Sequence, residues 1–148
     1  MDKLLNKLRV KDESKILILN APSGYLKLFC DYNVDVNIDL KSKYDFIQNF
    51  EMEYSNAEKI AGDLISVLKN DGLLWLCYPK GSSKKYKSDI NRNKSWGLYA
   101  AFEFEPVSQV SIDDDWSSIR YRNVDKIKTL KRKTAATEKG KERIKNNE

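Results

Sequence analysis

The residues best suited to bind a ligand form a loop that directly follows a short apolar segment. Residues 80–94 carry six lysines and arginines against one acidic residue, Asp89, and small residues among them leave backbone amides accessible. A helix predicted to begin near Ser88 would add the positive end of its dipole. This combination is typical of an anion or nucleotide site, although a solvated connection is the alternative. The candidate ligand-binding residues are Tyr78, Lys80, Ser82, Ser83, Lys84 and Lys85.

The apolar segment before this loop predicts where the site lies in the fold. Residues 73–78 are apolar or aromatic and stand between Gly72 and Pro79, which predicts a strand buried on both faces. A second buried strand is predicted over residues 15–20. Because ligands bind at the carboxyl ends of strands in open α/β sheets, we expect the turn after that strand to share the site. Its candidate residues are Asn20, Ser23 and Gly24.

A second group of charged residues lies around a predicted hairpin. Three aspartates at 113–115 lead into a strand on which Trp116, Arg120 and Arg122 share one face. This face could clamp a planar anion, but salt bridges between the aspartates and the arginines are the favoured interpretation. Consecutive aspartates in a turn point in different directions, so no metal site is predicted. The secondary candidates are Asp113, Asp115, Trp116, Arg120 and Arg122.

The absence of histidine from the sequence excludes several kinds of catalysis. Without it, Ser-His-Asp and Cys-His mechanisms and histidine-ligated metals cannot operate. The two cysteines, Cys30 and Cys77, lie among apolar residues and are expected to be buried, reduced thiols. No catalytic residue is therefore predicted.

The charge is distributed unevenly along the chain. The net charge is +5, but residues 126–148 hold nine lysines and arginines against three glutamates, which leaves a balance of −1 for residues 1–125. We expect a domain over residues 1–125 and a basic, flexible tail over 126–148. Weak nucleic-acid contact is possible through the densest basic group, Lys128, Lys131, Arg132 and Lys133. No signal peptide or membrane-spanning segment is evident, so a cytoplasmic protein is predicted.

The remaining patterns predict the other helices and strands. Ser55 and Glu58 have the spacing of a capping box at the start of a helix that Asp71-Gly72 would end. The strands over 34–39 and 44–50 are too close for a parallel crossover, so they form an antiparallel pair or one lies outside the main ladder. A short helix is expected over residues 4–8, and another over 23–30, capped by Ser23, with Leu26, Phe29 and Cys30 facing inward. A further helix is expected to begin at Ser88 or Asp89 and to end at Pro106. The strands over 107–112 and 116–122 are expected to form an antiparallel hairpin.

Together these elements predict a small Rossmann-like α/β domain, a three-layer sandwich with a mostly parallel sheet and a C-terminal antiparallel hairpin. Three segments, 19–22, 75–80 and 112–122, resemble an uncharacterised family of small bacterial domains with a methyltransferase-like outline. The resemblance covers residues 3–125 and implies the fold, but it implies no assigned activity.

The methyltransferase outline raises the question of S-adenosylmethionine as a cofactor. The turn over residues 20–24 has one glycine, and Pro22 removes a backbone donor, so this cofactor is disfavoured. The leading hypothesis is a binding or regulatory module without catalytic activity that takes an anionic ligand at the strand ends. The alternatives are an S-adenosylmethionine-dependent methyltransferase and a nucleic-acid-associated protein that uses the tail.

Overall fold

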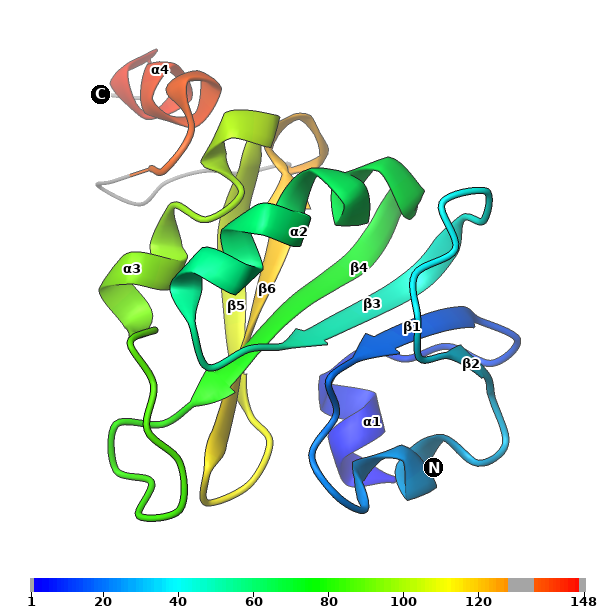
Figure 1. Ribbon diagram of the computed structural model, residues 1–148. Helices are drawn as coiled ribbons and strands as arrows, with labels where there is room; N and C mark the ends of the chain where they lie inside the picture. Colours follow the sequence, from blue (N-terminus) through cyan, green and yellow to red (C-terminus); the bar gives the residue numbers. More distant parts are fainter. Residues whose placement is uncertain (1, 128–134, 147–148) are drawn as a thin grey trace.

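A six-stranded mixed sheet forms the centre of the computed structural model, which describes residues 2–127 and 135–146 (Figure 1). The strand order is β2-β1-β3-β4-β6-β5. The pairs β2-β1, β1-β3 and β3-β4 are parallel, whereas β6 is antiparallel to both β4 and β5. The strands are β1 (Lys15–Leu19), β2 (Asn33–Asp35), β3 (Tyr44–Phe50), β4 (Leu68–Pro79), β5 (Phe104–Ser111) and β6 (Trp116–Asn123).

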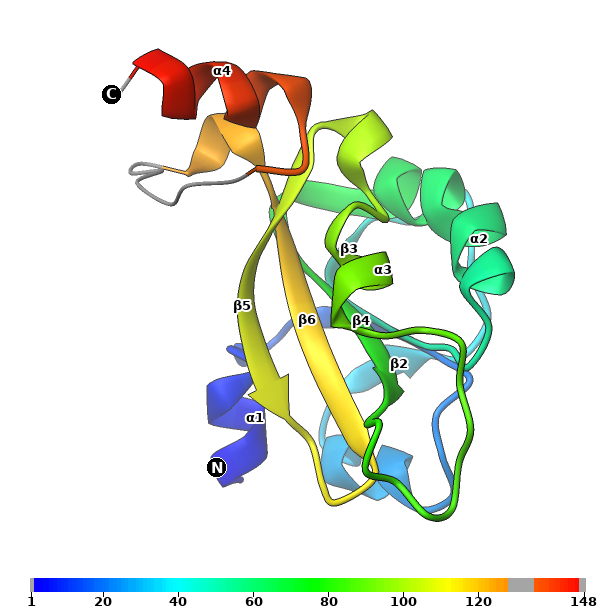
Figure 2. The ribbon, with the colours of Figure 1, turned by 90° about the vertical axis from the view of Figure 1, so that its left-hand side faces the viewer.

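Helices cover both faces of the sheet. One face carries α2 (Tyr54–Val67) and α3 (Arg92–Trp96), and the other carries α1 (Lys3–Lys7) and the 3-10 helix η1 (Tyr25–Phe29) (Figures 1 and 2). Each face has its own apolar core, the first with α2 and the second with α1 and η1. The predicted three-layer α/β sandwich with a C-terminal hairpin is confirmed. The shorter elements are η2 (Ala100–Phe102), η3 (Val124–Lys126) and α4 (Glu138–Asn146).

Strand β4 lies between β3 and β6 and is buried on both faces, as its apolar sequence predicted. Leu74, Leu76 and Tyr78 pack in the core under α2, while Trp75 and Cys77 pack in the opposite core. This alternation follows from the pleat, which turns successive side chains to opposite faces. The strand delivers the lysine-rich loop to the carboxyl edge of the sheet.

Both predicted arrangements of the strands over 34–39 and 44–50, an antiparallel pair or one strand outside the main ladder, are wrong. Both β2 and β3 pair in parallel with β1, on its two sides, which leaves β2 as a three-residue edge strand. The hydroxyl of Tyr44, the first residue of β3, donates to Asp35 at the end of β2. The short connection therefore passes from one side of β1 to the other without a helix.

The predicted helix ends differ from the observed ones. Ser23 does not cap η1; Gly24 precedes it with a φ of 83°, which a glycine adopts without strain. The side chain of Ser55 does not cap α2, which begins at Tyr54 and ends at Val67, because β4 already begins at Leu68. Leu26 and Cys30 are exposed, contrary to the prediction.

The predicted second helix is broken into α3 and η2, and Pro106 lies inside β5. Gly97 ends α3 after five residues. Pro106 lies at an irregularity in the pairing of the edge strand β5, a position where a proline costs no ladder hydrogen bond. The loop after β4 thus leads to a short helix that begins at Arg92 and not near Ser88.

Part of the predicted tail contacts the domain. The fully buried carboxylate of Glu105 on β5 accepts hydrogen bonds from the backbone N–H groups of Ala136 and Thr137, at 2.9 and 2.7 Å. Arg143 of α4 donates to the carbonyl of Val124 at 2.7 Å. The division at residue 125 remains a prediction, and Lys128, Lys131, Arg132 and Lys133 lie outside the described residues.

Candidate functional site

A cavity of about 990 Å³, here called the basic pocket, lies at the carboxyl end of β4. Three cationic side chains line it, Lys80, Lys87 and Arg92, and none of its described lining residues carries a carboxylate. Four of the predicted site residues line this pocket, and Lys84 and Lys85 do not. Polar groups complete the wall, including Tyr78, Ser82, Ser83, Ser88, Asn91, Gln109, Ser111 and Ser117.

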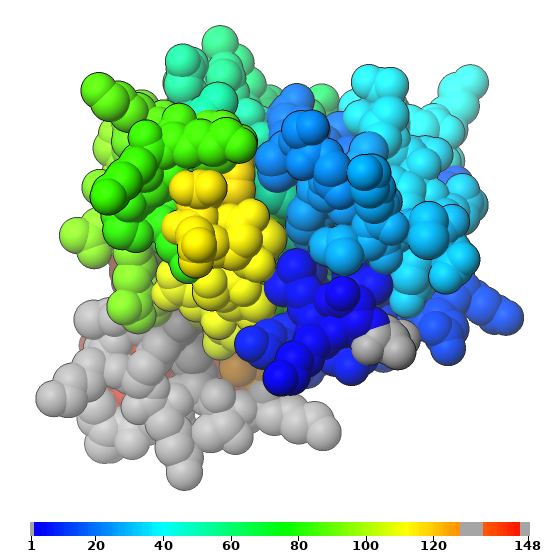
Figure 3. Space-filling model, turned by 90° about the horizontal axis from the view of Figure 1, so that it is seen from below, coloured from blue at the N-terminus to red at the C-terminus, as the bar shows by residue number. Residues whose placement is uncertain are grey.

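The start of the lysine-rich loop is fixed to the β5-β6 hairpin. The backbone N–H of Lys80 donates to the carbonyl of Asp115 at 2.8 Å, and the Lys80 ammonium donates to Ser111 Oγ at 2.6 Å. Ser83 Oγ donates to the Asp115 carboxylate at 2.8 Å. Figure 3 shows this hairpin (yellow) between the loop (green) and the segment around η1 (blue). Lys80 therefore lies at a defined position in the wall of the pocket.

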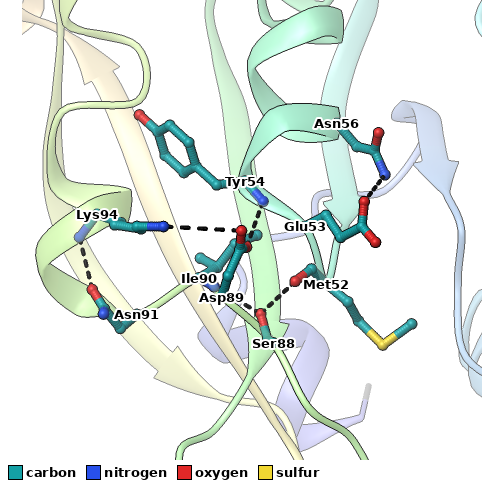
Figure 4. A network of polar contacts seen from close by, with 9 residues as sticks. All are labelled: Met52, Glu53, Tyr54, Asn56, Ser88, Asp89, Ile90, Asn91 and Lys94. Carbon is teal, nitrogen blue, oxygen red and sulfur yellow. Dashed lines mark hydrogen bonds and ion pairs between the residues drawn. The ribbon is translucent and has the colours of Figure 1, made fainter.

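The end of the loop is fixed to the start of α2 (Figure 4). Ser88 Oγ and the backbone N–H of Asp89 both donate to the carbonyl of Met52, at 2.7 and 3.2 Å. The Asp89 carboxylate accepts from the backbone N–H of Tyr54 at 2.7 Å. A carboxylate thus already occupies the N-terminus of α2, and the positive charge in the described wall of the basic pocket comes from the side chains of Lys80, Lys87 and Arg92.

A second cavity of about 560 Å³, here called the acidic pocket, lies where β1 and β3 end. Its lining includes Glu51 and Glu53, and none of its described lining residues is cationic. Burial raises the pKa of Glu51, and the nearby charge of Glu53 raises it further. The described lining residues are Asn20, Pro22, Phe50, Glu51, Met52, Glu53, Asn56, Tyr86 and Trp116.

Aromatic rings form one side of the acidic pocket. The ring centre of Trp116 lies 5.2 Å from that of Phe50 and 5.1 Å from that of Tyr86. Trp116 is 4% exposed, and its indole N–H has no hydrogen-bond partner within the described residues. Tyr86 also lines the basic pocket, so the two cavities are neighbours that share this residue.

The acidic pocket was not predicted from the sequence. Its signal was the segment 51–53, in which Glu51 directly follows the correctly predicted strand over 44–50 and Glu53 comes two residues later. Of the predicted turn residues, Asn20 lines this pocket, with a φ of 58°. Ser23 and Gly24 line neither cavity.

The secondary candidates are not brought together. Asp113 holds the hairpin turn, because its carboxylate accepts from the N–H groups of Asp115 and Trp116, both at 2.8 Å. Trp116 and Arg122 lie at opposite ends of β6, paired with Pro79 and Glu105. Trp116 and Arg122 therefore do not form one binding site for a planar anion.

The predicted salt bridge of Arg122 with the hairpin aspartates is wrong. Its Nε and Nη2 donate to the two carboxylate oxygens of Asp71, at 2.8 and 2.7 Å, which lowers the pKa of Asp71. Arg120 is buried, and in the part of the chain that the structure describes its Nε has no hydrogen-bond partner. Burial lowers the pKa of Arg120, and the charges of Arg9 and Arg122 lower it further.

No three histidine, cysteine, aspartate or glutamate side chains in residues 2–127 and 135–146 gather as a metal site requires. No helix in these ranges has the length and apolar character of a membrane span. Burial raises the pKa of the Cys77 thiol to about 12.

Comparison with known proteins identifies the fold. No protein-family model and no curated protein sequence matches the chain. Among solved structures, an S-adenosylmethionine-dependent methyltransferase from Aquifex aeolicus is similar, with a TM-score of 0.61, 13% identity, and coverage of 82% of this chain and 88% of that one. A putative type 11 methyltransferase from Sulfolobus solfataricus has a TM-score of 0.55, 12% identity and coverage of 82% and 89%.

A protein of the NADB-Rossmann superfamily from Streptococcus agalactiae is also similar, with a TM-score of 0.53, 13% identity and coverage of 83% and 68%. Sequence identities this low establish the architecture and leave the activity open. The chain has a methyltransferase-like α/β fold, distantly similar in structure to S-adenosylmethionine-dependent methyltransferases and other Rossmann-like proteins.

Proposed function

We propose that the protein is a cytoplasmic binding module that takes a small phosphate-bearing anion in the basic pocket and catalyses no reaction. The observation that supports this is the clustering of Lys80, Lys87 and Arg92 around one cavity whose described wall has no carboxylate. Cationic donors bind phosphate oxygens through charge-assisted hydrogen bonds. Hydroxyl and amide groups in the same wall would orient the ligand.

Calorimetric titration with inorganic phosphate and a nucleoside monophosphate at low salt tests the proposal. Lys80→Ala, Lys87→Ala and Arg92→Ala are each expected to weaken binding by about tenfold. Lys84→Ala is the matched control, because Lys84 is an exposed lysine of the same loop that does not line the pocket. Unchanged affinity in the triple variant, or no binding at millimolar ligand, would reject the proposal.

An S-adenosylmethionine-dependent methyltransferase is the second candidate, favoured by the similarity in fold and by the acidic pocket at the ends of β1 and β3. Pro22 in the turn after β1 argues against it, since a proline has no backbone N–H group to donate to the cofactor. Titration with S-adenosylhomocysteine distinguishes the two. Micromolar binding would favour the methyltransferase, and no binding at millimolar ligand would exclude it. The resemblance to an uncharacterised family of small bacterial domains stays a prediction, and it favours neither candidate because that family has no assigned activity.

Nucleic-acid association through Lys128, Lys131, Arg132 and Lys133 remains a prediction. Deletion of the C-terminal segment is a poor test, because it also removes Ala136 and Thr137 from the buried Glu105 carboxylate. Alanine substitution of the four basic residues keeps these contacts. Salt-dependent binding of nucleic acid that this variant loses would support the prediction.

A further inference from the structure

The two pockets carry opposite charge on the two sides of one shared residue. The basic pocket contributes Lys80, Lys87 and Arg92, while the acidic pocket contributes Glu51 and Glu53. A ligand with a single charge would satisfy one of these cavities only. The charge pattern is complementary to a ligand that is negative at one end and positive at the other.

The acidic pocket has the chemistry of a site for an organic cation. The half-buried carboxylate of Glu51 has a raised pKa, so a positive charge beside it would relieve an unfavourable environment. Tyr86, which is half-buried, lines this pocket together with the buried Phe50 and Trp116, and aromatic rings attract ammonium groups. Carboxylates and an aromatic ring that is not fully buried therefore line the same cavity.

A cation already contacts Tyr86, the residue that the two pockets share. The ammonium of Lys85 lies 5.4 Å from the ring centre of Tyr86, within the range of a cation–π contact. The indole N–H of Trp116, which lines the acidic pocket, is buried and has no hydrogen-bond partner among the described residues. The ring of Tyr86 is therefore placed to contact an ammonium group, and the wall of the acidic pocket contains a buried donor without a described partner.

From this geometry we infer that the ligand is a phosphorylated amine, with its phosphate in the basic pocket and its ammonium group in the acidic pocket. The inference rests on the proposed function, since it takes the basic pocket to be the phosphate site. Glu51 and Glu53 pair with the ammonium group, and Tyr86 lies beside the chain that joins the two ends. The ligand binds without any covalent change.

Titration of the full chain with 2-aminoethyl phosphate, 4-aminobutyl phosphate and the amine-free ethyl and butyl phosphates tests the inference. At least one aminoalkyl phosphate is expected to bind about tenfold more tightly than its amine-free partner. Glu51→Gln and Glu53→Gln are expected to remove this advantage and to leave the affinity for ethyl phosphate unchanged. Glu58→Gln is the control, because Glu58 is an exposed carboxylate that lines neither cavity.

The outcomes separate the two proposals. Equal affinity for aminoalkyl and alkyl phosphates would reject the phosphorylated amine and leave the phosphate site intact. If no phosphate ester binds, both proposals are rejected. The comparison of esters on the unaltered protein decides the matter even if the glutamate variants do not fold, and circular dichroism identifies that case.

Discussion

The carboxylate of Asp89 accepts a hydrogen bond from the backbone N–H of Tyr54, the first residue of α2, at a distance of 2.7 Å (Figure 4). The contact joins the loop after β4 to the helix that follows β3. It satisfies one of the N–H groups that a helix leaves without an internal partner. Lys94 lies 3.9 Å from the same carboxylate. The side chain of Asp89 thus caps α2 and also fixes the end of the loop that lines the basic pocket.

Removal of this carboxylate is expected to weaken both features. Asp89→Ala should lower the free energy of unfolding by about 1 kcal/mol, the usual cost of losing a helix cap, as measured by urea denaturation. The same variant should increase amide hydrogen exchange over residues 80–90, because the loop loses its attachment to α2. Asp114→Ala is the control, since Asp114 is an exposed aspartate in the hairpin turn. Equal exchange in the two variants would contradict the role given to Asp89.

This contact also explains why the start of α2 was not predicted in detail. Ser55 and Glu58 match the local pattern of a capping box, but the residue that caps the helix lies 35 positions away in the sequence. Local patterns were sufficient for β3, β4 and the C-terminal hairpin, because apolar runs and alternation decide which segments are buried. They were insufficient at the start of α2, where a distant side chain accepts the hydrogen bond from the N–H group of Tyr54.

The candidate site was also predictable from local sequence patterns only in part. The basic pocket was predictable in part, because Lys80, Ser82 and Ser83 directly follow a buried strand. The acidic pocket was not, since its glutamates follow β3 while Tyr86 and Trp116 come from two later segments. The strand order brings these segments together, and the sequence did not reveal that β2 and β3 flank β1.

Substitution of Gly140 is expected to detach α4 from the sheet. A methyl group at Gly140 would overlap the Glu105 carboxylate and would lie 2.8 Å from Thr137 Oγ1. Because Glu105 is fully buried and holds Thr137, the overlap cannot be relieved without breaking hydrogen bonds. We expect Gly140→Ala to lower the free energy of unfolding by about 1–3 kcal/mol and to speed proteolysis within residues 136–146.

The matched control for this prediction is Gly97→Ala. Gly97 follows α3, and a Cβ placed there meets no atom within 4 Å. The variant should unfold at nearly the wild-type urea concentration. Equal stability and proteolysis of the two alanine variants would show that close packing at Gly140 does not hold α4 in place.

The two thiols are expected to react at different rates. Cys30 is exposed, whereas Cys77 is fully buried and its thiol has a pKa of about 12. Since the thiolate is the reactive form, a disulfide reagent at pH 8 should modify one thiol quickly in the native protein and both in denaturant. Mass spectrometry of the peptides should find the fast label on Cys30. Fast labelling of Cys77 would mean that the sheet opens readily at β4.

Stability is expected to fall in alkaline solution, because buried acids keep their protons in the folded state. Burial raises the pKa of the Cys77 thiol from 9.0 to about 12, and it also raises the pKa values of the Tyr25, Tyr99 and Tyr121 hydroxyls above 10.0. Above pH 9 the unfolded chain releases protons that the folded chain retains, so rising pH favours unfolding. Below pH 9 this contribution is fully present.

Each such group should remove about 1.4 kcal/mol of stability per pH unit once its unfolded form ionises. Urea denaturation at intervals from pH 7 to pH 11 would measure the slope. Cys77→Ala should reduce the slope that begins near pH 9 and leave the steeper fall above pH 10, where the tyrosines contribute. A profile of Cys77→Ala that matched the wild type would show that Cys77 does not stay protonated in the folded chain.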